Sequence, residues 1–208
     1  MDNEQLKIFD EDRNEIGVAS RGEVHKLGYW HETFHCWFTT NEEGIDYIYF
    51  QIRSSEKQDY PNLLDITAAG HLLVDETICD GIREVQEETG IKVSFDELIG
   101  LGVIKYCVER NCFIDKEFAN VFLYQSKNTF NDFKVQRDEV LGIVRAQFKE
   151  FYQFCLQEKE DIRIEGFELN KSGRKVPIDK LVNKNHFVPH ENAFYEKVAK
   201  LIKKTLNL

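Results

Sequence analysis

The sequence predicts an α/β protein with one main domain and a C-terminal appendage, and three observations support this prediction. Segments in which aromatic and β-branched residues roughly alternate with polar ones recur along the chain, which is typical of strands. One glutamate-rich stretch has apolar residues at helical spacing and ends at a glycine. The last part combines a hairpin-like turn with an amphipathic helix. We therefore divide the 208 residues into a domain at 1–158 and an appendage at 159–208 packed on it.

The predicted strands are mostly joined as hairpins, in which two apolar runs enclose a polar turn. These hairpins are residues 6–9 with 15–19, 34–39 with 47–53, and 162–169 with 174–178. Further strands are predicted at residues 98–108, 118–125 and 140–145. A polar connection at 54–63 carries Pro61 and separates the second hairpin from the glutamate-rich stretch.

Three segments have the pattern of helices. Residues 77–89 place Ile78, Ile82 and Val85 on one side and stop at Gly90. Residues 148–157 resemble a second helix, and residues 191–206 a third, with lysines near its C-terminal end, where the helix dipole favours cations. The apolar side of this last helix permits homodimerisation without demanding it.

Composition and charge restrict the classes of function. The formal net charge of −10 argues against nucleic acid as the main partner, because phosphate backbones are bound by basic surfaces. No apolar run reaches the ~20 residues of a membrane-spanning helix, and the N-terminus lacks a secretion signal. The five cysteines are an odd number without a CxxC pair, which is typical of reduced thiols. We expect a cytoplasmic protein with no membrane partner.

Three glutamates lie on one face of the helix predicted at 77–89. Glu84, Glu87 and Glu88 have the spacing i, i+3 and i+4, which projects their carboxylates from the same side. Such a group is either a solvated acidic surface or a site for Mg²⁺ or Mn²⁺, cations that prefer oxygen ligands and share them with substrate phosphates. The three glutamates alone do not decide between these interpretations.

The surrounding residues resemble the Nudix box. Its pattern is a glycine, five residues, a glutamate, seven residues, and then REUxEExGU, where U is aliphatic. Gly70 and Glu76 have the required separation, and residues 83–91, Arg-Glu-Val-Gln-Glu-Glu-Thr-Gly-Ile, match every specified position. One departure exists, because six residues lie between Glu76 and Arg83 instead of seven. Near a junction between loop and helix, this shortening can be absorbed.

The resemblance implies a fold, an activity and roles for the box residues. The fold would be a Nudix α/β/α sandwich around a mixed sheet, with an N-terminal hairpin added here. The activity would be metal-dependent cleavage of a diphosphate bond, with Mg²⁺ or Mn²⁺ as cofactor. Glu84 and Glu88 would be the main metal ligands, and Glu87 a ligand or a water-holder. The Gly70 carbonyl would be a backbone ligand, and Arg83 would orient the glutamates by pairing with Glu76.

A wider resemblance points to the branch of this superfamily that includes the type I isopentenyl-diphosphate isomerases. It is carried by residues 30–34, 65–71 and 115–118. In those isomerases three histidines and two acidic residues hold a metal, and the corresponding residues here are His25, His31, His71, Asp115 and Glu117. Histidine and carboxylate mixtures suit Mn²⁺, Zn²⁺ or Mg²⁺. Each residue also has an ordinary interpretation, as a surface histidine or a loop acid.

Isomerase activity itself is not expected. That reaction uses a cysteine directly before the Gly-His pair, and Ala69 occupies this position and cannot transfer a proton. Cys36 and Cys79 do not occupy it, and we interpret them as buried thiols. We therefore predict a Nudix pyrophosphatase acting on a nucleoside-diphosphate-type or other organic diphosphate. The alternatives are an isomerase-like enzyme and a non-catalytic nucleotide-sensing domain.

The remaining candidates concern the general base and the substrate. Nudix hydrolases often take the base from outside the box, and Glu117 and Glu139 are the candidates here. The aromatic residues at 29–38 are expected mostly in the core, although they include candidates for stacking on a substrate. His186 and His190 are interpreted as structural. No motif identifies which diphosphate compound is the substrate.

Overall fold

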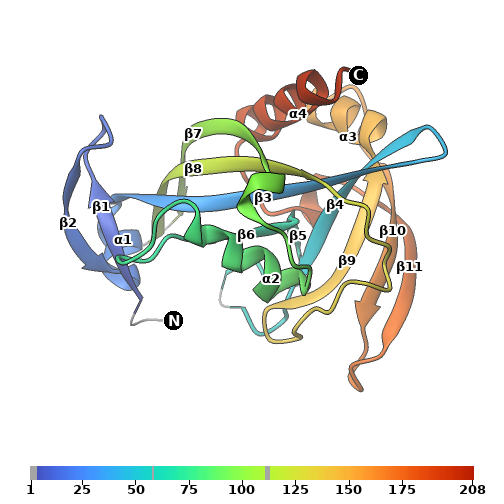
Figure 1. The fold of residues 1–208 in the computed structure, drawn as a ribbon, viewed down its shortest axis with the longest axis horizontal. Coiled ribbons are helices and arrows are strands. Elements are labelled where there is room, and N and C mark those ends of the chain that lie inside the picture. Colours follow the sequence, from blue (N-terminus) through green and yellow to red (C-terminus); the bar gives the residue numbers. More distant parts are fainter. Residues whose placement is uncertain (1–3, 58, 111–112) are drawn as a thin grey trace.

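The computed structural model describes residues 4–57, 59–110 and 113–208. Figure 1 shows a large twisted sheet with helices on both sides. The strands are β1 (Gln5–Phe9), β2 (Glu15–Ser20), β3 (Trp30–Glu42), β4 (Ile45–Arg53), β5 (Leu64–Ile66), β6 (Ala68–His71), β7 (Ile99–Arg110), β8 (Phe113–Gln125), β9 (Val140–Gln147), β10 (Ile162–Leu169) and β11 (Lys175–Val182). The helices are α1 (Arg21–Leu27), α2 (Arg83–Thr89), α3 (Phe148–Cys155) and α4 (Asn192–Leu206), and 3₁₀ turns lie at Asp80–Ile82, Phe95–Glu97 and Lys184–His186.

The sheet is mixed, and the long strand β3 lies at its centre. The main order is β11-β10-β9-β4-β3-β1-β2, with β5 on β4, β6 on β3, and β8 between β3 and β7. Strand β8 runs parallel to β3, whereas β4 and β6 are antiparallel to their neighbours. The register places His31 beside Glu117 and Thr33 beside His71. Three residues of the second predicted metal site, His31, His71 and Glu117, therefore lie on β3 or on a strand that borders it.

Alternating side chains on the central strands fill two separate cores. Trp37 on β3 packs with Phe151 of α3 and the apolar side of α4. Its neighbours Phe34 and Phe38 point to the opposite face and pack with Val85 of α2. Because successive strand residues point to opposite faces, one strand supplies both cores. The predicted α/β/α sandwich around a mixed sheet is confirmed.

Two helical regions differ from the prediction. The segment predicted as one helix at 77–89 starts with a turn in which the Asp80 carboxylate accepts hydrogen bonds from the Thr77 amide and hydroxyl, continues as the 3₁₀ turn and becomes α-helical only at Arg83. Cys79 in this turn is exposed, so its interpretation as a buried thiol was wrong, whereas Cys36 is buried. Helix α1 was not predicted. Its signal was the capping box formed by Ser20 and Glu23.

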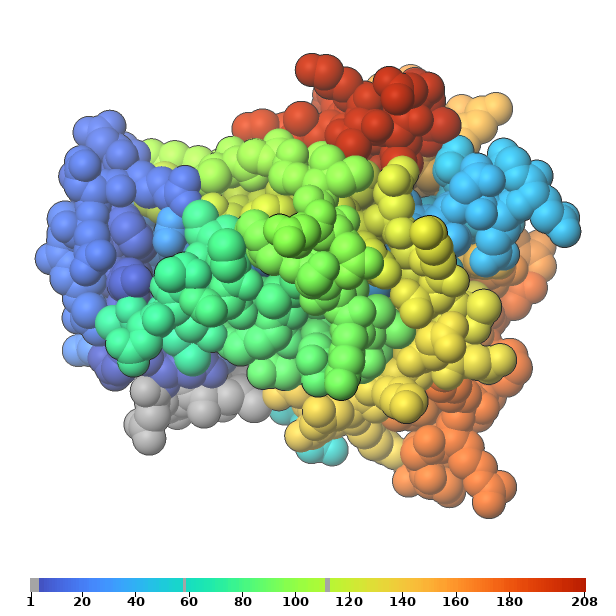
Figure 2. All heavy atoms as spheres, viewed as in Figure 1, coloured from blue at the N-terminus to red at the C-terminus, as the bar shows by residue number. Residues whose placement is uncertain are grey.

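The C-terminal part continues the sheet and both cores. Strand β10 pairs with β9 and with the edge strand β11, while Phe194 and Val198 of α4 contribute to the core on the α3 side. In the space-filling view, this hairpin in orange lies at one end of the molecule and the N-terminal hairpin in blue at the other (Figure 2). In the described ranges, no helix is long and apolar enough to cross a membrane.

Candidate active site

The glutamate helix presents two carboxylates to a pocket, the buried one of Glu88 and the largely buried one of Glu84. Glu88 is 4% exposed and accepts hydrogen bonds at Oε2 from Gln51 Nε2 and from the Ala69 amide, each 2.9 Å long. Glu84 lies one turn earlier, with its carboxylate against Gly70 of β6. A Cβ atom at Gly70 would overlap that carboxylate and lie 2.7 Å from its Oε2. Glycine at this position therefore allows the backbone and the carboxylate to approach closely.

Arg83 fixes the orientation of this helix. Its guanidinium forms a two-pronged ion pair with Glu76, with Nη2 3.0 Å from Oε2, and donates a 3.1 Å hydrogen bond to the His71 carbonyl. It also contacts Glu84 at 2.6 Å and Glu87 at 3.1 Å. The structure thus contains the contact between Glu76 and Arg83 despite the shortened spacing.

The two buried carboxylates are destabilised in their charged forms. Burial raises the pKa of Glu84 to about 7, although the nearby Arg83 guanidinium opposes this shift. Burial and the charge of Glu84 together raise the pKa of Glu88 to about 8. A divalent cation between two such carboxylates would replace the missing positive charge. The donor set fits Mg²⁺ or Mn²⁺, which prefer carboxylate oxygens.

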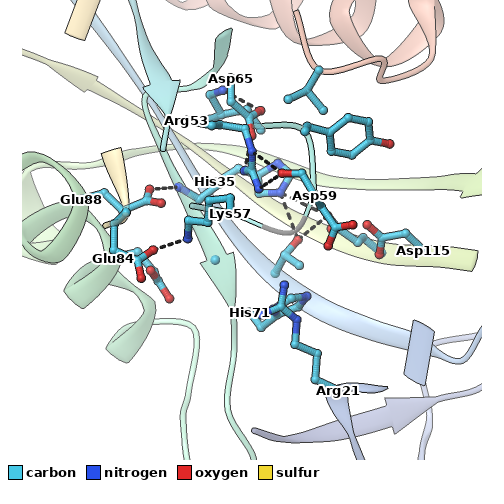
Figure 3. A pocket seen from close by; sticks show the side chains of 18 of the residues that line it. Arg21, His35, Arg53, Lys57, Asp59, Asp65, His71, Glu84, Glu88 and Asp115 are labelled. Carbon is cyan, nitrogen blue, oxygen red and sulfur yellow. Dashed lines mark hydrogen bonds and ion pairs between the residues drawn. The ribbon is translucent and has the colours of Figure 1, made fainter. Parts of the chain in front are cut away.

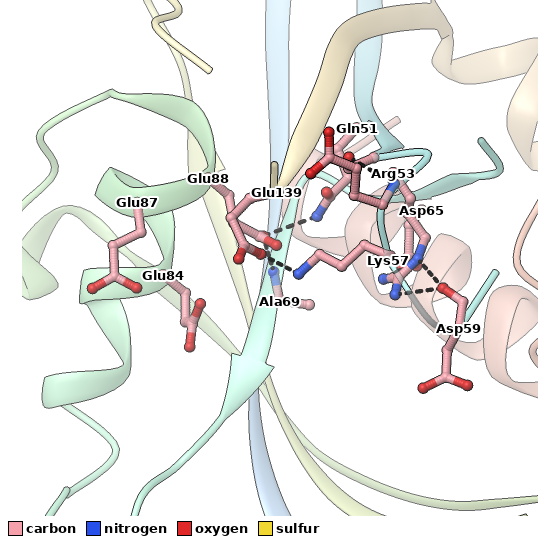
Figure 4. Close-up of polar contacts among 12 residues, drawn as sticks. Gln51, Arg53, Lys57, Asp59, Asp65, Ala69, Glu84, Glu87, Glu88 and Glu139 are labelled. Carbon is pink, nitrogen blue, oxygen red and sulfur yellow. Dashed lines mark hydrogen bonds and ion pairs between the residues drawn. The ribbon is translucent and has the colours of Figure 1, made fainter. Parts of the chain in front are cut away.

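Glu87 differs from these two residues. Its side chain is 53% exposed and pairs with Arg83 on the same helix. Among the described residues, groups of three whose metal-ligating atoms all lie within 4.8 Å of one another occur only among the histidines and acids of the second predicted site. The three glutamates do not form such a group, so their carboxylates do not converge on one point. Figure 4 shows Glu87 turned away from Glu88. The face predicted from helical spacing exists, but only Glu84 and Glu88 are enclosed.

The second predicted set of ligands comes together from four elements. His25 lies on α1, His31 on β3, His71 on β6, and Asp115 with Glu117 on β8. Ligand atoms of the three histidines lie within 4.8 Å of one another, and so do those of His31, Asp115 and Glu117. The Asp115 Oδ1 atom is 3.5 Å from His25 Nε2 and 3.4 Å from His31 Nε2.

The protonation and hydrogen bonding of this histidine and carboxylate cluster also suit a bound cation. His31 Nδ1 lies 3.2 Å from the Tyr29 carbonyl, which favours a proton on Nδ1 and leaves Nε2 with a lone pair. His25 Nε2, His31 Nε2 and Asp115 Oδ1 are buried without a hydrogen-bond partner. Burial lowers the pKa of His31 and of His71, so these rings are held neutral, the form that binds metal. Unpartnered buried polar atoms are rare, and a shared cation would satisfy all three.

Both groups border one pocket of about 280 Å³, which all their members line except the fully buried His31. Figure 3 shows Glu84 and Glu88 on one wall, with His71 and Asp115 on another. Two basic residues, Arg53 and Lys57, also line the pocket. Arg53 Nη1 donates to Asp65 at 2.8 Å, and its Nε and Nη2 both donate to the Asp59 carbonyl. Lys57 forms an ion pair with Glu139.

Comparison with known proteins identifies the family. No protein-family model matches the chain. An uncharacterized Nudix hydrolase from Clostridium acetobutylicum, however, is 40% identical over 204 residues, which cover 97% of this chain and 98% of that protein. This chain belongs to the Nudix hydrolase family. The predicted resemblance is confirmed at this level.

Other relatives of this Nudix hydrolase are more distant. Nudix hydrolase 3 from Arabidopsis thaliana is 29% identical over 176 residues, which cover 82% of this chain but only 22% of that protein. Two solved structures share the fold. The protein DR0079 from Deinococcus radiodurans has a TM-score of 0.55 at 17% identity, covering 75% of this chain and 91% of that one. A MutT protein from Methanosarcina mazei has a TM-score of 0.52 at 16% identity, covering 85% and 95%.

The two general-base candidates of the Nudix hydrolase have different surroundings. Glu117 is buried, accepts a 2.8 Å hydrogen bond from the Thr33 hydroxyl and lies 3.2 Å from His35 Nε2. Burial raises the pKa of Glu117, but the hydrogen bond to His35 and the charges that His35, His31 and His71 can carry together outweigh burial and hold the pKa well below its usual range. Glu139 is partly exposed at the pocket and is paired with Lys57.

Several pocket residues were not recognised from the sequence. Arg53 and Lys57 lie at the end of a strand and in the polar connection, where no spacing pattern distinguishes them from solvated cations. His190, interpreted as structural, lines the pocket and lies 3.2 Å from Asp65. By contrast, His186 is exposed and, among the residues that the structure describes, its ring bonds only within its own turn. Of the aromatic residues proposed for stacking, Phe34, Trp37 and Phe38 are fully buried in the two cores.

Proposed function

We propose that this Nudix hydrolase is a metal-dependent pyrophosphatase that cleaves a diphosphate bond in a small nucleoside-diphosphate-type or other organic diphosphate. The observation that carries this proposal is one pocket that joins the largely buried Glu84 carboxylate and the buried Glu88 carboxylate to the cations Arg53 and Lys57. A guanidinium and an ammonium group suit phosphate oxygens. The carboxylate pair suits the Mg²⁺ or Mn²⁺ that such substrates carry.

The residues have distinct tasks in this proposal. Glu84 and Glu88 would hold the cation, with the Gly70 carbonyl as the predicted backbone ligand, and Arg83 with Glu76 keeps Glu84 in place. When bound, the cation supplies Lewis-acid polarisation of the phosphoryl oxygens. Arg53 and Lys57 bind the non-bridging oxygens and orient the diphosphate for attack.

We assign the general base to Glu139. Glu117 is engaged by Thr33 and His35, and the lowered pKa of its carboxylate makes it a weak proton acceptor. Glu139 is held only by Lys57 among the described side chains, and Lys57 can turn to a substrate phosphate. Substrate binding would then free the Glu139 carboxylate to accept a proton from water.

A panel of diphosphate compounds tests the proposed function. We expect at least one of ADP-ribose, dinucleoside polyphosphates, coenzyme A, oxidised nucleotides or isopentenyl diphosphate to be cleaved with Mg²⁺ or Mn²⁺ and to be stable after chelation. Phosphorus NMR reads both monoester products and released phosphate. If no compound is cleaved with either metal, while the protein is folded by circular dichroism, the proposal is wrong.

We also place the chain in the isopentenyl-diphosphate-isomerase-like branch, on the basis of the histidine cluster. Isomerisation is the second candidate function that this cluster favours, and Ala69 argues against it because a methyl group cannot protonate an alkene. The isopentenyl diphosphate sample of the panel is therefore run in deuterated water. Deuterated dimethylallyl product formed at enzyme-like rates would replace the hydrolase proposal with the isomerase.

We further propose that His25, His31, His71, Asp115 and Glu117 hold a second divalent cation. The support is the convergence of their ligand atoms and the three buried atoms without partners. Metal analysis of the wild type should give two equivalents, and His31→Gln should give one. The occupancy should also fall as the pH drops, because protonated imidazole does not bind metal. The control is His186→Gln, an exposed histidine outside the cluster; equal metal content in all three proteins would refute the second site.

Three other features of the protein are predicted from the sequence alone. They are the cytoplasmic location, the homodimer, and the division into a domain at 1–158 and an appendage at 159–208. The absence of a nucleic-acid partner likewise rests on the net charge of −10.

A further inference from the structure

The segment at 187–190 reaches the pocket from the C-terminal part of the chain. It is attached to β5 by a bridge between Phe187 and Leu64 and by a 2.9 Å hydrogen bond from the Val188 amide to the Leu64 carbonyl. On the other side, the Tyr195 hydroxyl of α4 donates a 2.8 Å hydrogen bond to the Val188 carbonyl. The segment is therefore fixed on both sides directly before His190.

His190 is connected to Arg53 through a single carboxylate. Its Nε2 lies 3.2 Å from Asp65 Oδ1, and Asp65 Oδ2 accepts a 2.8 Å bond from Arg53 Nη1. Burial raises the pKa of Asp65, but the bond from His190 and the charge of Arg53 outweigh it and lower the pKa to about 2. Asp65 is thus an anion at neutral pH, and His190 Nε2 is the donor to it.

Arg53 has little freedom while Asp65 is held. Its Nε and Nη2 donate to the Asp59 carbonyl at 3.1 and 2.9 Å, and Nη1 donates to Asp65, so these contacts define the plane of the guanidinium. Figure 4 shows Arg53 between Asp65 and Asp59, beside Lys57. A side chain that is fixed before substrate binds loses less conformational entropy on binding.

We propose that His190 is a positioning residue for the diphosphate: it holds Asp65, and through Asp65 it holds the guanidinium of Arg53. This inference rests on the proposed function, in which Arg53 binds phosphate oxygens. It makes the C-terminal segment part of the active site, because Val188 and His190 of this segment line the pocket.

The imidazole of His190 also packs against aromatic rings, and an experiment must distinguish this packing from the proposed positioning of Asp65. Its ring lies 5.0 Å from that of Phe194, 5.4 Å from that of Tyr195 and 5.5 Å from that of Tyr106. A phenylalanine at this position keeps an aromatic ring in the cluster and removes the N–H donor. A glutamine places an amide nitrogen near the position of Nε2 and restores the donor.

Binding of methylene diphosphonate, a diphosphate analogue that cannot be hydrolysed, tests the proposal by calorimetry in Mg²⁺. We expect His190→Phe to raise Kd about tenfold, the effect of about one hydrogen bond to a charged group, and His190→Gln to recover most of the affinity. His186→Phe is the matched control and should bind like the wild type. With a cleaved substrate, His190→Phe should raise KM and change kcat little.

A double-mutant cycle tests whether the effect passes through Arg53. In an Arg53→Ala background, His190→Phe should not weaken binding further, because the guanidinium that it positions is gone. If His190→Phe binds like the wild type, or weakens binding equally in both backgrounds, the inference is wrong. If the wild type itself does not bind the analogue, it is the phosphate-binding role of Arg53 in the proposed function that fails.

Nitrogen NMR of the histidine rings tests the same contact in the unmodified protein, and so does not depend on the folding of a variant. We expect His190 to carry its proton on Nε2 and its signals to shift when methylene diphosphonate is added, with those of His186 unchanged. A proton on Nδ1, or His190 signals that do not respond to bound analogue, would overturn the positioning role.

Discussion

Replacing Glu88 by glutamine is expected to lower turnover by about 10²–10³-fold, the effect of losing several kcal/mol of metal-dependent stabilisation. Glutamine has nearly the same size, and its carbonyl can accept the two hydrogen bonds from Gln51 and the Ala69 amide. The fold should therefore persist while the negative charge is lost. Turnover of the best substrate from the panel, measured across a Mg²⁺ titration, checks this result. A wild-type rate at every Mg²⁺ concentration would remove Glu88 from the metal site.

The matched control is Glu196→Gln, which alters a glutamate on the exposed side of α4 that pairs with Lys200. A pH series without metal gives a second readout. The folded pKa of Glu88, about 8, lies above its ordinary value of 4.5, so the folded state binds this proton more tightly. Its contribution to stability is present below pH 4.5 and is lost as the pH rises to 8. Relative to the wild type, Glu88→Gln should become more stable as the pH rises through this window, as measured by thermal unfolding.

The sequence predicts the fold well where short-range patterns determine it. Alternation in β3 and β4, the stop at Gly90 and the polar turn between β10 and β11 all depend on neighbouring residues. Strand β6 has only four residues, and its sequence Ala-Ala-Gly-His has no strand pattern. It is held in place by pairing with β3, a contact with a residue far away in the chain. Such tertiary pairing is not visible in a local pattern.

The site residues also separate into those that a short-range sequence pattern predicts and those that depend on tertiary packing. The box residues share one helix and one short loop, so their spacing predicts that Glu84 and Glu88 lie on the same face. Which carboxylate is enclosed depends on packing, and only the structure distinguishes the buried Glu88 from the exposed Glu87. His190 is 125 positions from Asp65 in sequence. Its role follows from the docking of the C-terminal segment on β5, for which the sequence contains no signal.

Replacing Gly70 by alanine is expected to lower turnover about 10²-fold with only a modest loss of stability. The new methyl group would overlap the Glu84 carboxylate, far inside the ~3.5 Å at which carbon atoms make contact. Because the overlapping atoms are the end of a side chain beside a pocket, that carboxylate can turn away at an overpacking cost of about 1–3 kcal/mol or less. The metal affinity should fall together with the rate, so the Mg²⁺ concentration needed for half-maximal turnover should rise.

Gly22 of α1 provides the matched control, since a Cβ atom there meets nothing within 4 Å, and Gly22→Ala should leave turnover unchanged. Shortening the opposing side chain tests the cause. In a Glu84→Asp background the carboxylate is withdrawn by one methylene group, so Gly70→Ala should lower the rate by a smaller factor than it does in the wild type. Equal factors in the two backgrounds would mean that the methyl group acts on something other than Glu84. A wild-type rate for Gly70→Ala would mean that the position of the Glu84 carboxylate does not limit catalysis, and Glu84 would then lose its place as a ligand.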